Sequence, residues 1–176
     1  MYPFLRMARV MALARRQPEL GLFDTHVSQL ICWPWDLDPW VELNNGRTLT
    51  LYDLGRLPLA RRTGVERVLR ERGWGLTVAG SSTRYRKRVT MFMRLTMRTR
   101  CLGWDHRFLY MEQSMWRGED CASQVLIRSA VTSKAGIVPP RELAREMGVA
   151  EEGPELPGWV KAWTEAEAQR PWPPAR

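Results

Sequence analysis

The sequence has few cysteines, and their spacing excludes two classes of protein. Cys32, Cys101 and Cys121 are far apart and form no CxxC pair, and no histidine lies at metal-ligand spacing from them. The pattern therefore predicts neither a disulfide framework nor a zinc site. We expect these side chains to fill small apolar positions in a protein kept in a reducing compartment.

The sequence also lacks an uninterrupted apolar run of the length that a membrane span requires. Arg6 and Arg9 interrupt the N-terminal segment, which therefore has no apolar centre like that of a secretion signal. We expect a cytoplasmic protein. Residues 1–21 form an amphipathic helical segment, which we expect to pack on its own domain, although the same pattern is also typical of helices on a membrane surface.

Several motifs with known chemistry are absent. The chain contains no GxSxG, no P-loop, no GxGxxG and no HExxH, so a serine hydrolase, an NTPase, a dinucleotide enzyme and a zinc protease each lack their expected signature. The two histidines, His26 and His106, are isolated in the sequence. We expect both to be structural or surface residues rather than members of a Ser–His–Asp set.

The positive charge that is present is almost all arginine. The net charge is +8, and only three of the 27 basic residues are lysines. Arginine suits phosphate recognition because its guanidinium fork matches phosphate geometry. The basic run at residues 84–88 raises nucleic-acid binding as an alternative, but the acidic loop and tail interrupt the basic surface, so we expect no nucleic-acid partner.

The first half of the chain reads as one strand followed by helices. Residues 23–33 are rich in β-branched and apolar side chains and predict a strand, which Pro34 ends. Asn44 or Asn45 is a good N-cap for an apolar, buried helix. Pro58 predicts a kink or restart near residues 56–57, and residues 63–72 predict a second short helix.

The second half changes to strand-like alternation. Four consecutive strand candidates follow, at residues 74–89, 91–104, 106–118 and 122–134, and a short helix follows Pro139 and Pro140. The predicted domains are an N-terminal helical segment (1–21), a single α+β domain (22–150) and a tail (151–176) in which Trp159 and Trp163 anchor one or two helical turns. A buried helix against a curled antiparallel sheet excludes the doubly wound nucleotide folds.

Residues 36–56, DLDPWVELNNGRTLTLYDLGR, carry a more specific pattern. An Asp-x-Asp step at Asp36–Asp38, an Asn pair at Asn44–Asn45 and a following helix resemble the signature of the hotdog-fold acyl-CoA thioesterases of the 4-hydroxybenzoyl-CoA thioesterase type. The resemblance covers roughly residues 22–140. It implies a hotdog fold, in which a long central helix is wrapped by a curved antiparallel β-sheet. Glu42 stands where the family commonly has His, and Thr48 where it commonly has Tyr.

The resemblance implies roles for residues at the start of the helix. Asp38 would be the general base or nucleophile, and the backbone N–H groups around Asn45 and Gly46 would stabilise the oxyanion. The first N–H groups of a helix are suited to this, since they lack partners within the helix and carry partial positive charge. The alternative is that Asp38 only caps a turn and that Asn44 and Asn45 only cap the helix.

Other residues are candidates for holding the substrate. Glu42, Asn44 and Thr48 would surround the reacting group. Arg84, Arg86 and Arg88 alternate, so on a strand they share a face that could meet the phosphates of coenzyme A or simply face solvent. Asp53 and Arg56 form a local ion pair or contribute to a pocket. The candidates for an acyl tunnel, which also suit a core role, are Leu49, Tyr52, Met91 and Met93.

The sequence therefore predicts an acyl-CoA thioesterase-like hydrolase that cleaves an acyl thioester to the free acid and a thiol. By resemblance it would be a homodimer, or a tetramer, with the acyl pocket at the subunit interface. Its substrate would be an acyl-CoA or acyl-carrier thioester, with no metal and no cofactor beyond the coenzyme A of the substrate. The alternative, motivated by Glu42 and Thr48, is a non-catalytic hotdog protein that binds an acyl ligand or a partner protein.

Overall fold

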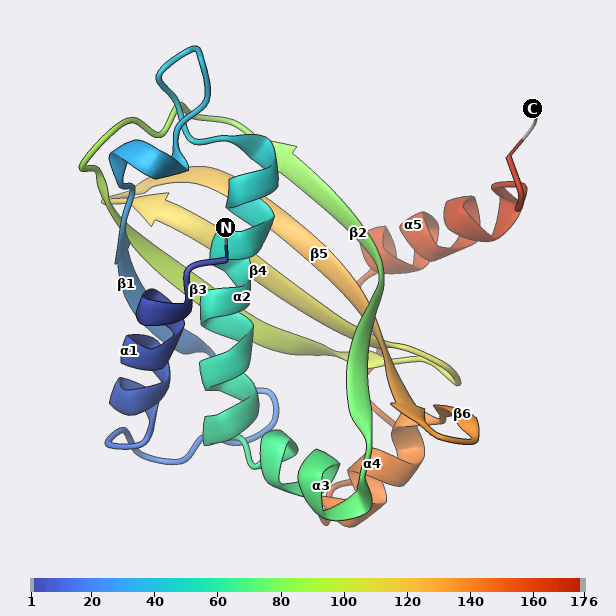
Figure 1. The fold of residues 1–176 in the computed structure, drawn as a ribbon. Coiled ribbons are helices and arrows are strands. Elements are labelled where there is room, and N and C mark those ends of the chain that lie inside the picture. The colour runs from blue at the N-terminus through green and yellow to red at the C-terminus, as the bar shows by residue number, and fades with distance from the viewer. Residues whose placement is uncertain (1, 175–176) are drawn as a thin grey trace.

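In the computed structural model, which describes residues 2–174, one long helix lies in the concave face of a curved antiparallel sheet (Figure 1). The helix is α2 (Asn45–Arg62). The six strands are β1 (His26–Ile31), β2 (Gly75–Tyr85), β3 (Arg94–Trp104), β4 (Leu109–Arg117), β5 (Asp120–Ser133) and β6 (Gly136–Val138). This arrangement confirms the predicted α+β hotdog fold.

The strand order leaves β2 at one edge of the sheet. The order is β1-β3-β4-β5-β2, with β6 paired to β5, and every pairing is antiparallel. β2 runs the length of β5, from Gly75 opposite Thr132 to Tyr85 opposite Ser123. Within residues 2–174, the other edge of β2 has no neighbouring strand. Two strands are shorter than the sequence predicted: β1 covers 26–31 of the predicted 23–33, and β2 covers 75–85 of the predicted 74–89.

Helix α2 is continuous, so of the kink or restart predicted near residues 56–57 the restart is wrong. It passes through Pro58 and ends only at Arg62, before Gly64 adopts a left-handed conformation with φ 83°. Proline removes one helical hydrogen bond, a cost that the packing of this buried helix outweighs. Gly64 ends the helix because a residue without Cβ adopts positive φ without strain. The next helix is α3 (Val65–Arg72).

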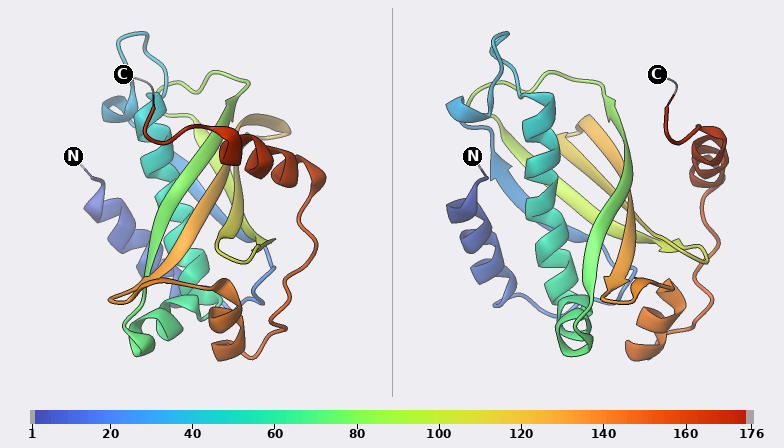
Figure 2. Two further views of the ribbon diagram at one scale, coloured as in Figure 1. Left: turned by 90° about the vertical axis from the view of Figure 1, so that its right-hand side faces the viewer. Right: turned by 45° about the vertical axis from the view of Figure 1, so that its right-hand side comes forward.

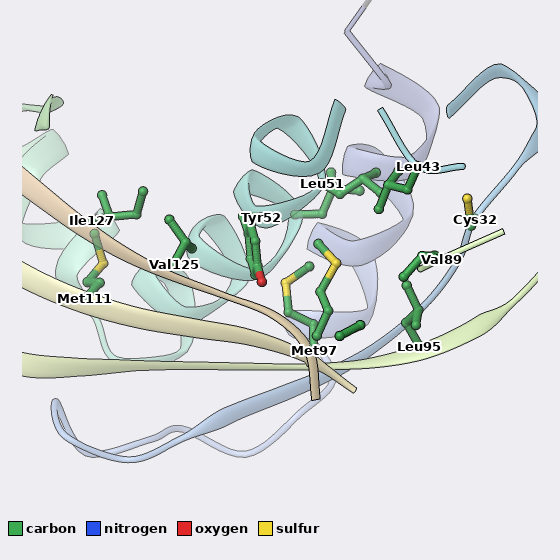
Figure 3. Packing of buried hydrophobic residues seen from close by; sticks show 13 residues of the cluster. Cys32, Leu43, Leu51, Tyr52, Val89, Leu95, Met97, Met111, Val125 and Ile127 are labelled. Carbon is green, nitrogen blue, oxygen red and sulfur yellow. The ribbon is translucent and has the colours of Figure 1, made fainter. Parts of the chain in front are cut away.

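The main core lies between α2 and the concave face of the sheet (Figure 3). Leu51 and Tyr52 of α2 pack against Met97 and Val125 of the sheet, and all four side chains are fully buried. The closest approach is at Gly55, where a Cβ atom would overlap Met97 Sδ and Thr99 Oγ1. The absence of a side chain at this position therefore lets the helix sit deep in the sheet.

The remaining helices cover different surfaces of this unit (Figure 2). α1 (Phe4–Ala14) packs beside α2 through Met7 and Val10, which confirms that the N-terminal helix packs on its own domain. α4 (Pro140–Glu146) closes the end near α3. α5 (Gly158–Gln169) is longer than the expected one or two turns. Its Val160 and Trp163 pack with Tyr110 and Leu126 on the outer face of the sheet.

Candidate active site

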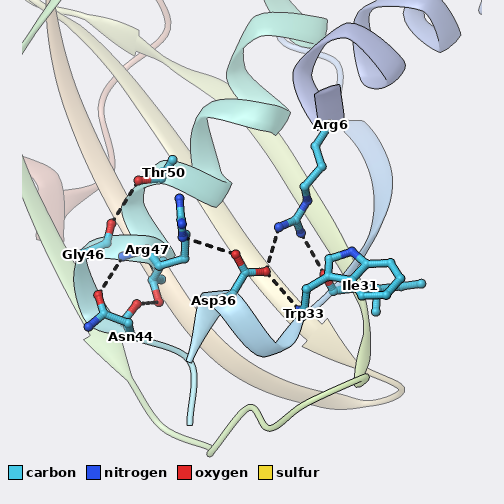
Figure 4. Close-up of polar contacts among 9 residues, drawn as sticks. Arg6, Ile31, Trp33, Asp36, Asn44, Gly46, Arg47 and Thr50 are labelled. Atoms are coloured by element: carbon cyan, nitrogen blue, oxygen red, sulfur yellow. Dashed lines mark hydrogen bonds and ion pairs between the residues drawn. The ribbon is translucent and has the colours of Figure 1, made fainter. Parts of the chain in front are cut away.

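The two aspartates of the Asp-x-Asp step have different environments. Asp36, in the 3-10 turn η1 (Pro34–Asp36), is 1% exposed. Arg6 Nη1 lies 2.7 Å from its Oδ2 and Arg47 Nε lies 3.2 Å from its Oδ1 (Figure 4). The backbone N–H of Trp33 also donates to Asp36 Oδ2 at 3.0 Å. Asp36 is therefore a structural carboxylate that joins α1, η1 and the start of α2.

Asp38 is partly exposed and organises a tight turn. Its Oδ1 accepts from the backbone N–H of Trp40 at 2.9 Å and of Glu42 at 3.4 Å, and its own N–H donates to the carbonyl of Glu42 at 2.8 Å. The capping role anticipated for Asp38 is thus present. Because these turn contacts are to Oδ1, the second oxygen can act as a base.

Asp38 also lines a cavity of about 570 Å³, here called the Asp38 cavity. It is bounded by the 38–43 loop, by the start of α2, and by the segment that follows β2. The structure brings six of the predicted site residues together there: Asp38, Glu42, Asn45, Thr48, Arg86 and Arg88. Asn44, Gly46 and Arg84 do not line it.

The start of α2 has the geometry of an anion-binding helix terminus. Asn44 is the N-cap, with its Oδ1 accepting from Arg47 N–H at 3.0 Å. Asn45 and Gly46 follow it in the first turn, where N–H groups have no acceptor within the helix. A Cβ atom on Gly46 would lie 3.3 Å from Asn44 Oδ1. Gly46 has no side chain and offers only its backbone, and of these two residues only Asn45 lines the cavity.

The two positions that depart from the family pattern are both held by the surrounding structure. Glu42 pairs with Arg88, whose Nε lies 2.8 Å from Glu42 Oε2. Thr48 is buried, and its Oγ1 donates to the carbonyl of Asn44 at 3.1 Å. Glu42 thus fixes a basic side chain at the cavity, and Thr48 supports the helix start.

The three alternating arginines do not share a strand face, contrary to the prediction. β2 ends at Tyr85, and the N–H groups of Arg86 and Lys87 both donate to the carbonyl of Ala122. This double contact turns the chain out of the strand, so the alternation of a strand stops there. Arg86 and Arg88 line the Asp38 cavity, whereas Arg84 remains on β2 away from it.

Sequence reasoning missed three polar groups of this cavity, Tyr85, Lys87 and Ser123. Ser123 Oγ lies 2.8 Å from the hydroxyl of Tyr52, in a buried pair. Burial raises the pKa of Tyr52 and also that of Tyr85, so both phenols stay protonated near neutral pH. No local motif marks Ser123, because only the packing of α2 on the concave face of the sheet brings this β5 residue beside Tyr52.

A second cavity, of about 730 Å³, lies at the opposite end of α2 and is here called the apolar cavity. Its lining includes Leu57 and Ala60 of α2, Leu76 and Val78 of β2, and Met111 of β4. The predicted acyl-tunnel residues line neither cavity. Tyr52 is buried in the main core, and the partly buried Leu49 and Met93 pack against that core. Met91 is 44% exposed.

Asp53 and Arg56 lie on the wall of the apolar cavity, and they form the predicted ion pair. Arg56 also donates to Gln113 Oε1 at 2.8 Å, so its guanidinium is anchored to the sheet. Burial raises the pKa of Asp53, while the charge of Arg56 opposes that effect. The same burial lowers the pKa of Arg56. A second charged pair, Glu66 and Arg70, also lines this cavity, and most of its remaining lining is apolar.

Residues 2–174 contain no group of three or more His, Cys, Asp or Glu side chains that could hold a metal ion. Across the same residues, no helix combines the length and the apolar character needed to cross a bilayer.

Comparisons with known proteins agree with the fold. A family model described as the Thioesterase-like superfamily matches residues 32–164. Protein THEM6 of Xenopus laevis is 32% identical over 164 residues, which cover 91% of this chain and 77% of that protein.

Two solved thioesterases resemble the chain in structure. The YbaW probable thioesterase from Escherichia coli has a TM-score of 0.65 at 15% identity, covering 69% of this chain and 94% of that one. The DHNA-CoA thioesterase from Staphylococcus aureus has a TM-score of 0.60 at 12% identity, covering 82% and 91%. The sequence matches establish the family and the structural matches establish the fold. The chain belongs to the thioesterase-like superfamily and has its hotdog fold.

Proposed function

We propose that this protein hydrolyses an acyl thioester, with Asp38 as the general base. The observation that carries the proposal is the position of Asp38 in a cavity that also contains the start of α2. The Asp38 carboxylate takes a proton from a water molecule, and the water oxygen attacks the thioester carbonyl carbon. The C–S bond then breaks, the sulfur leaves as a thiol after taking a proton, and the acyl group leaves as the acid. Direct attack by Asp38, with hydrolysis of the resulting anhydride, uses the same placement.

The helix start supplies the complementary group. The N–H groups at Asn45 and Gly46 stabilise the negative charge that develops on the carbonyl oxygen. Such donors are fixed before the reaction begins, so they do not have to reorganise as the charge appears. Arg86 and Arg88, beside the same cavity, hold phosphates of coenzyme A, and the ion pair with Glu42 orients Arg88.

The free edge of β2 supports a homodimer. β2 is an 11-residue strand, with Leu76 and Val78 exposed on it. An exposed edge of this length pairs readily with another strand. Two copies of β2 related by a two-fold axis form an antiparallel pair, which continues the sheet from one protomer into the next.

This pairing also explains how two distant cavities serve one substrate. In an antiparallel β2 pair, the Gly75 end of one strand lies beside the Tyr85 end of the other. Tyr85 lines the Asp38 cavity and Gly75 lines the apolar cavity. The dimer therefore places the apolar cavity of one protomer next to the Asp38 cavity of its partner, where it can receive the acyl chain.

The test of the chemistry is Asp38→Asn, assayed with a panel of acyl-CoA substrates from short to long acyl chains. Asparagine retains the Oδ1 atom that accepts from Trp40 and Glu42, so the turn should persist. We expect kcat to fall by about a hundredfold or more, as loss of a general base commonly causes. Circular dichroism and thermal unfolding should match those of the unmodified protein.

Asp24→Asn is the matched control. Asp24, which is exposed, caps a turn as Asp38 does, with its Oδ2 accepting from Gly21 N–H at 2.8 Å, but it lies outside the Asp38 cavity. This variant should retain full activity. Equal rates for Asp38→Asn and the unmodified protein would refute the proposed role. Thermal stabilisation by acyl-CoA without turnover would instead favour a non-catalytic protein that binds an acyl ligand.

A further inference from the structure

The end of the molecule near the start of α2 exposes an unusual set of large apolar side chains. They are 44–74% exposed and come from two loops, residues 33–43 and 86–93. We name this surface the aromatic end; its residues are Trp35, Trp40, Val41, Met91 and Phe92. Single exposed apolar residues are common, but a cluster on adjacent loops marks a surface that contacts a partner.

The two loops are joined into one fixed unit. Leu43 N–H donates to the carbonyl of Val89 at 2.8 Å, and Phe92 N–H donates to the carbonyl of Cys32 at 2.7 Å. The ring of Trp33 stacks on that of Trp35 at 5.3 Å and meets the ring of Phe92 edge-on at 5.9 Å. These contacts fix the two loops, so the apolar side chains of the aromatic end point outward and do not fold back onto the core.

Two residues of the aromatic end have an unfavourable backbone conformation. Val41 and Phe92 have φ of 60° and 63°, and they are the only non-glycine residues with positive φ in residues 2–174. This region costs free energy for any residue with a Cβ, and most for a β-branched one such as valine. Both side chains remain exposed, so burial within this chain does not offset the cost.

The positive charges beside the aromatic end indicate which kind of partner this surface binds. Arg84, Arg86, Lys87 and Arg88 precede Met91 and Phe92, and the whole chain has a net charge of +8. Lys87 and Arg88 have ion pairs with Asp120 and Glu42, but their side chains are 60% and 74% exposed and still face solvent. Exposed tryptophan and phenylalanine next to cationic side chains are suited to the interface of a bilayer with anionic headgroups.

We propose that loops 33–43 and 86–93 dock this protein on the surface of a membrane that contains anionic lipids. The exposed apolar side chains enter the headgroup region, and Arg84 and Lys87, which are not assigned to coenzyme A, contact lipid phosphates. We assign the contact to these loops because their apolar residues lie beside the basic run at residues 84–88; α1 packs against α2 through Met7 and Val10 and exposes Phe4 and Leu5 on its other side. The 33–43 loop, which includes η1, lies on the side of α2 away from β2 (Figure 1), whereas the 86–93 loop begins directly after β2 ends at Tyr85. Docking does not depend on hydrolysis.

The test is co-sedimentation of the full chain with phosphatidylcholine vesicles, with and without about 30% phosphatidylglycerol. The variant is Val41→Asn combined with Phe92→Asn, chosen because asparagine tolerates positive φ better than valine or phenylalanine. We expect the unmodified protein to bind the anionic vesicles. The double variant should fold at least as stably and bind about tenfold more weakly or worse.

Trp172→Asn is the matched control, because Trp172 is 86% exposed but lies in the C-terminal segment. It should bind like the unmodified protein. Failure of the unmodified protein to bind either kind of vesicle would overturn the proposal. So would binding that about 0.5 M NaCl abolishes and the double variant leaves unchanged, because a contact made by charge alone would equally suit an acidic protein surface.

Discussion

At the scale of single residues, burial decides which ionisable groups are structural. Three carboxylates lie within residues 36–42, and only the structure separates them: Asp36 is buried between two arginines, Asp38 is partly exposed at a cavity, and Glu42 pairs with Arg88. The two aspartates of the acidic step therefore have different roles: Asp36 is a structural ion-pair partner, and Asp38 is the candidate base.

His26 gives a prediction at this scale. Its Nδ1 lies 2.9 Å from Arg62 Nη1, which can only donate, so Nδ1 accepts and the ring is neutral. Burial, with a further effect of the Arg62 charge, lowers the pKa of His26 from 6.5 to about 4. Between these values the unfolded chain binds more protons than the folded one, so stability decreases as the pH falls through this range.

We expect this histidine to contribute a loss of about 2 kcal/mol in the free energy of unfolding between pH 7.5 and pH 5. Urea denaturation at the two pH values measures it. His26→Gln, which retains a hydrogen-bond acceptor, should show a smaller loss over the same interval. His106→Gln, at the exposed histidine, is the control and should behave like the unmodified protein. The same pH dependence in all three would contradict this account.

At the scale of secondary-structure elements, the position of α2 against the sheet depends on one missing side chain. Gly55 faces Met97 and Thr99 of β3, with Gln113 of β4 close by. The amide of Gln113 also donates to the carbonyl of Tyr52 at 2.8 Å and to Thr99 Oγ1 at 3.0 Å. The helix and the sheet are therefore in close contact at Gly55, and little space remains there for an added atom.

Gly55→Ala should destabilise the protein by about 2 to 3 kcal/mol, because the added methyl group pushes the helix away from the sheet. This occurs although alanine favours helices more than glycine does. Gly46→Ala in the same helix is the comparison; its Cβ would meet only Asn44 Oδ1, so we expect a change below about 1 kcal/mol. Chemical denaturation of both variants measures the difference. Equal effects would show that the helix can shift to accommodate the methyl group.

At the scale of the whole molecule, the two cavities lie at opposite ends of α2, and the proposed dimer brings them together in pairs. The apolar cavity, at about 730 Å³, is within the range of sites that hold whole small molecules. It has room for a long acyl chain, which leads to a prediction about substrate preference.

We expect kcat/KM to rise with acyl-chain length in the proposed enzyme. Ala60→Phe places a ring in the apolar cavity and should lower kcat/KM for long-chain acyl-CoA by about tenfold or more, with little effect on short chains. Ala162→Phe on the exposed surface of α5 is the control. An unchanged chain-length profile in Ala60→Phe would place the acyl chain elsewhere.

The sequence determined the class of fold and the neighbourhood of the site, because both depend on local patterns. Alternation after residue 74 indicated the strands, an Asn pair after the acidic step indicated the helix start, and Asp38 was identified through the family resemblance. The continuity of α2 through Pro58 was not predictable in this way. It depends on tertiary packing, which outweighs the local cost of proline.

Tertiary structure alone decided how distant residues meet. Arg6 reaches Asp36 because α1 packs beside α2, and Ser123 of β5 reaches Tyr52 because α2 packs on the concave face of the sheet. The turn after Tyr85, which places Arg86 and Arg88 at the cavity and leaves Arg84 outside, depends on a carbonyl of Ala122. The sequence by itself determines local conformation and the inventory of chemical groups. The long-range hydrogen bonds and packing of the folded chain select which of those groups share a site.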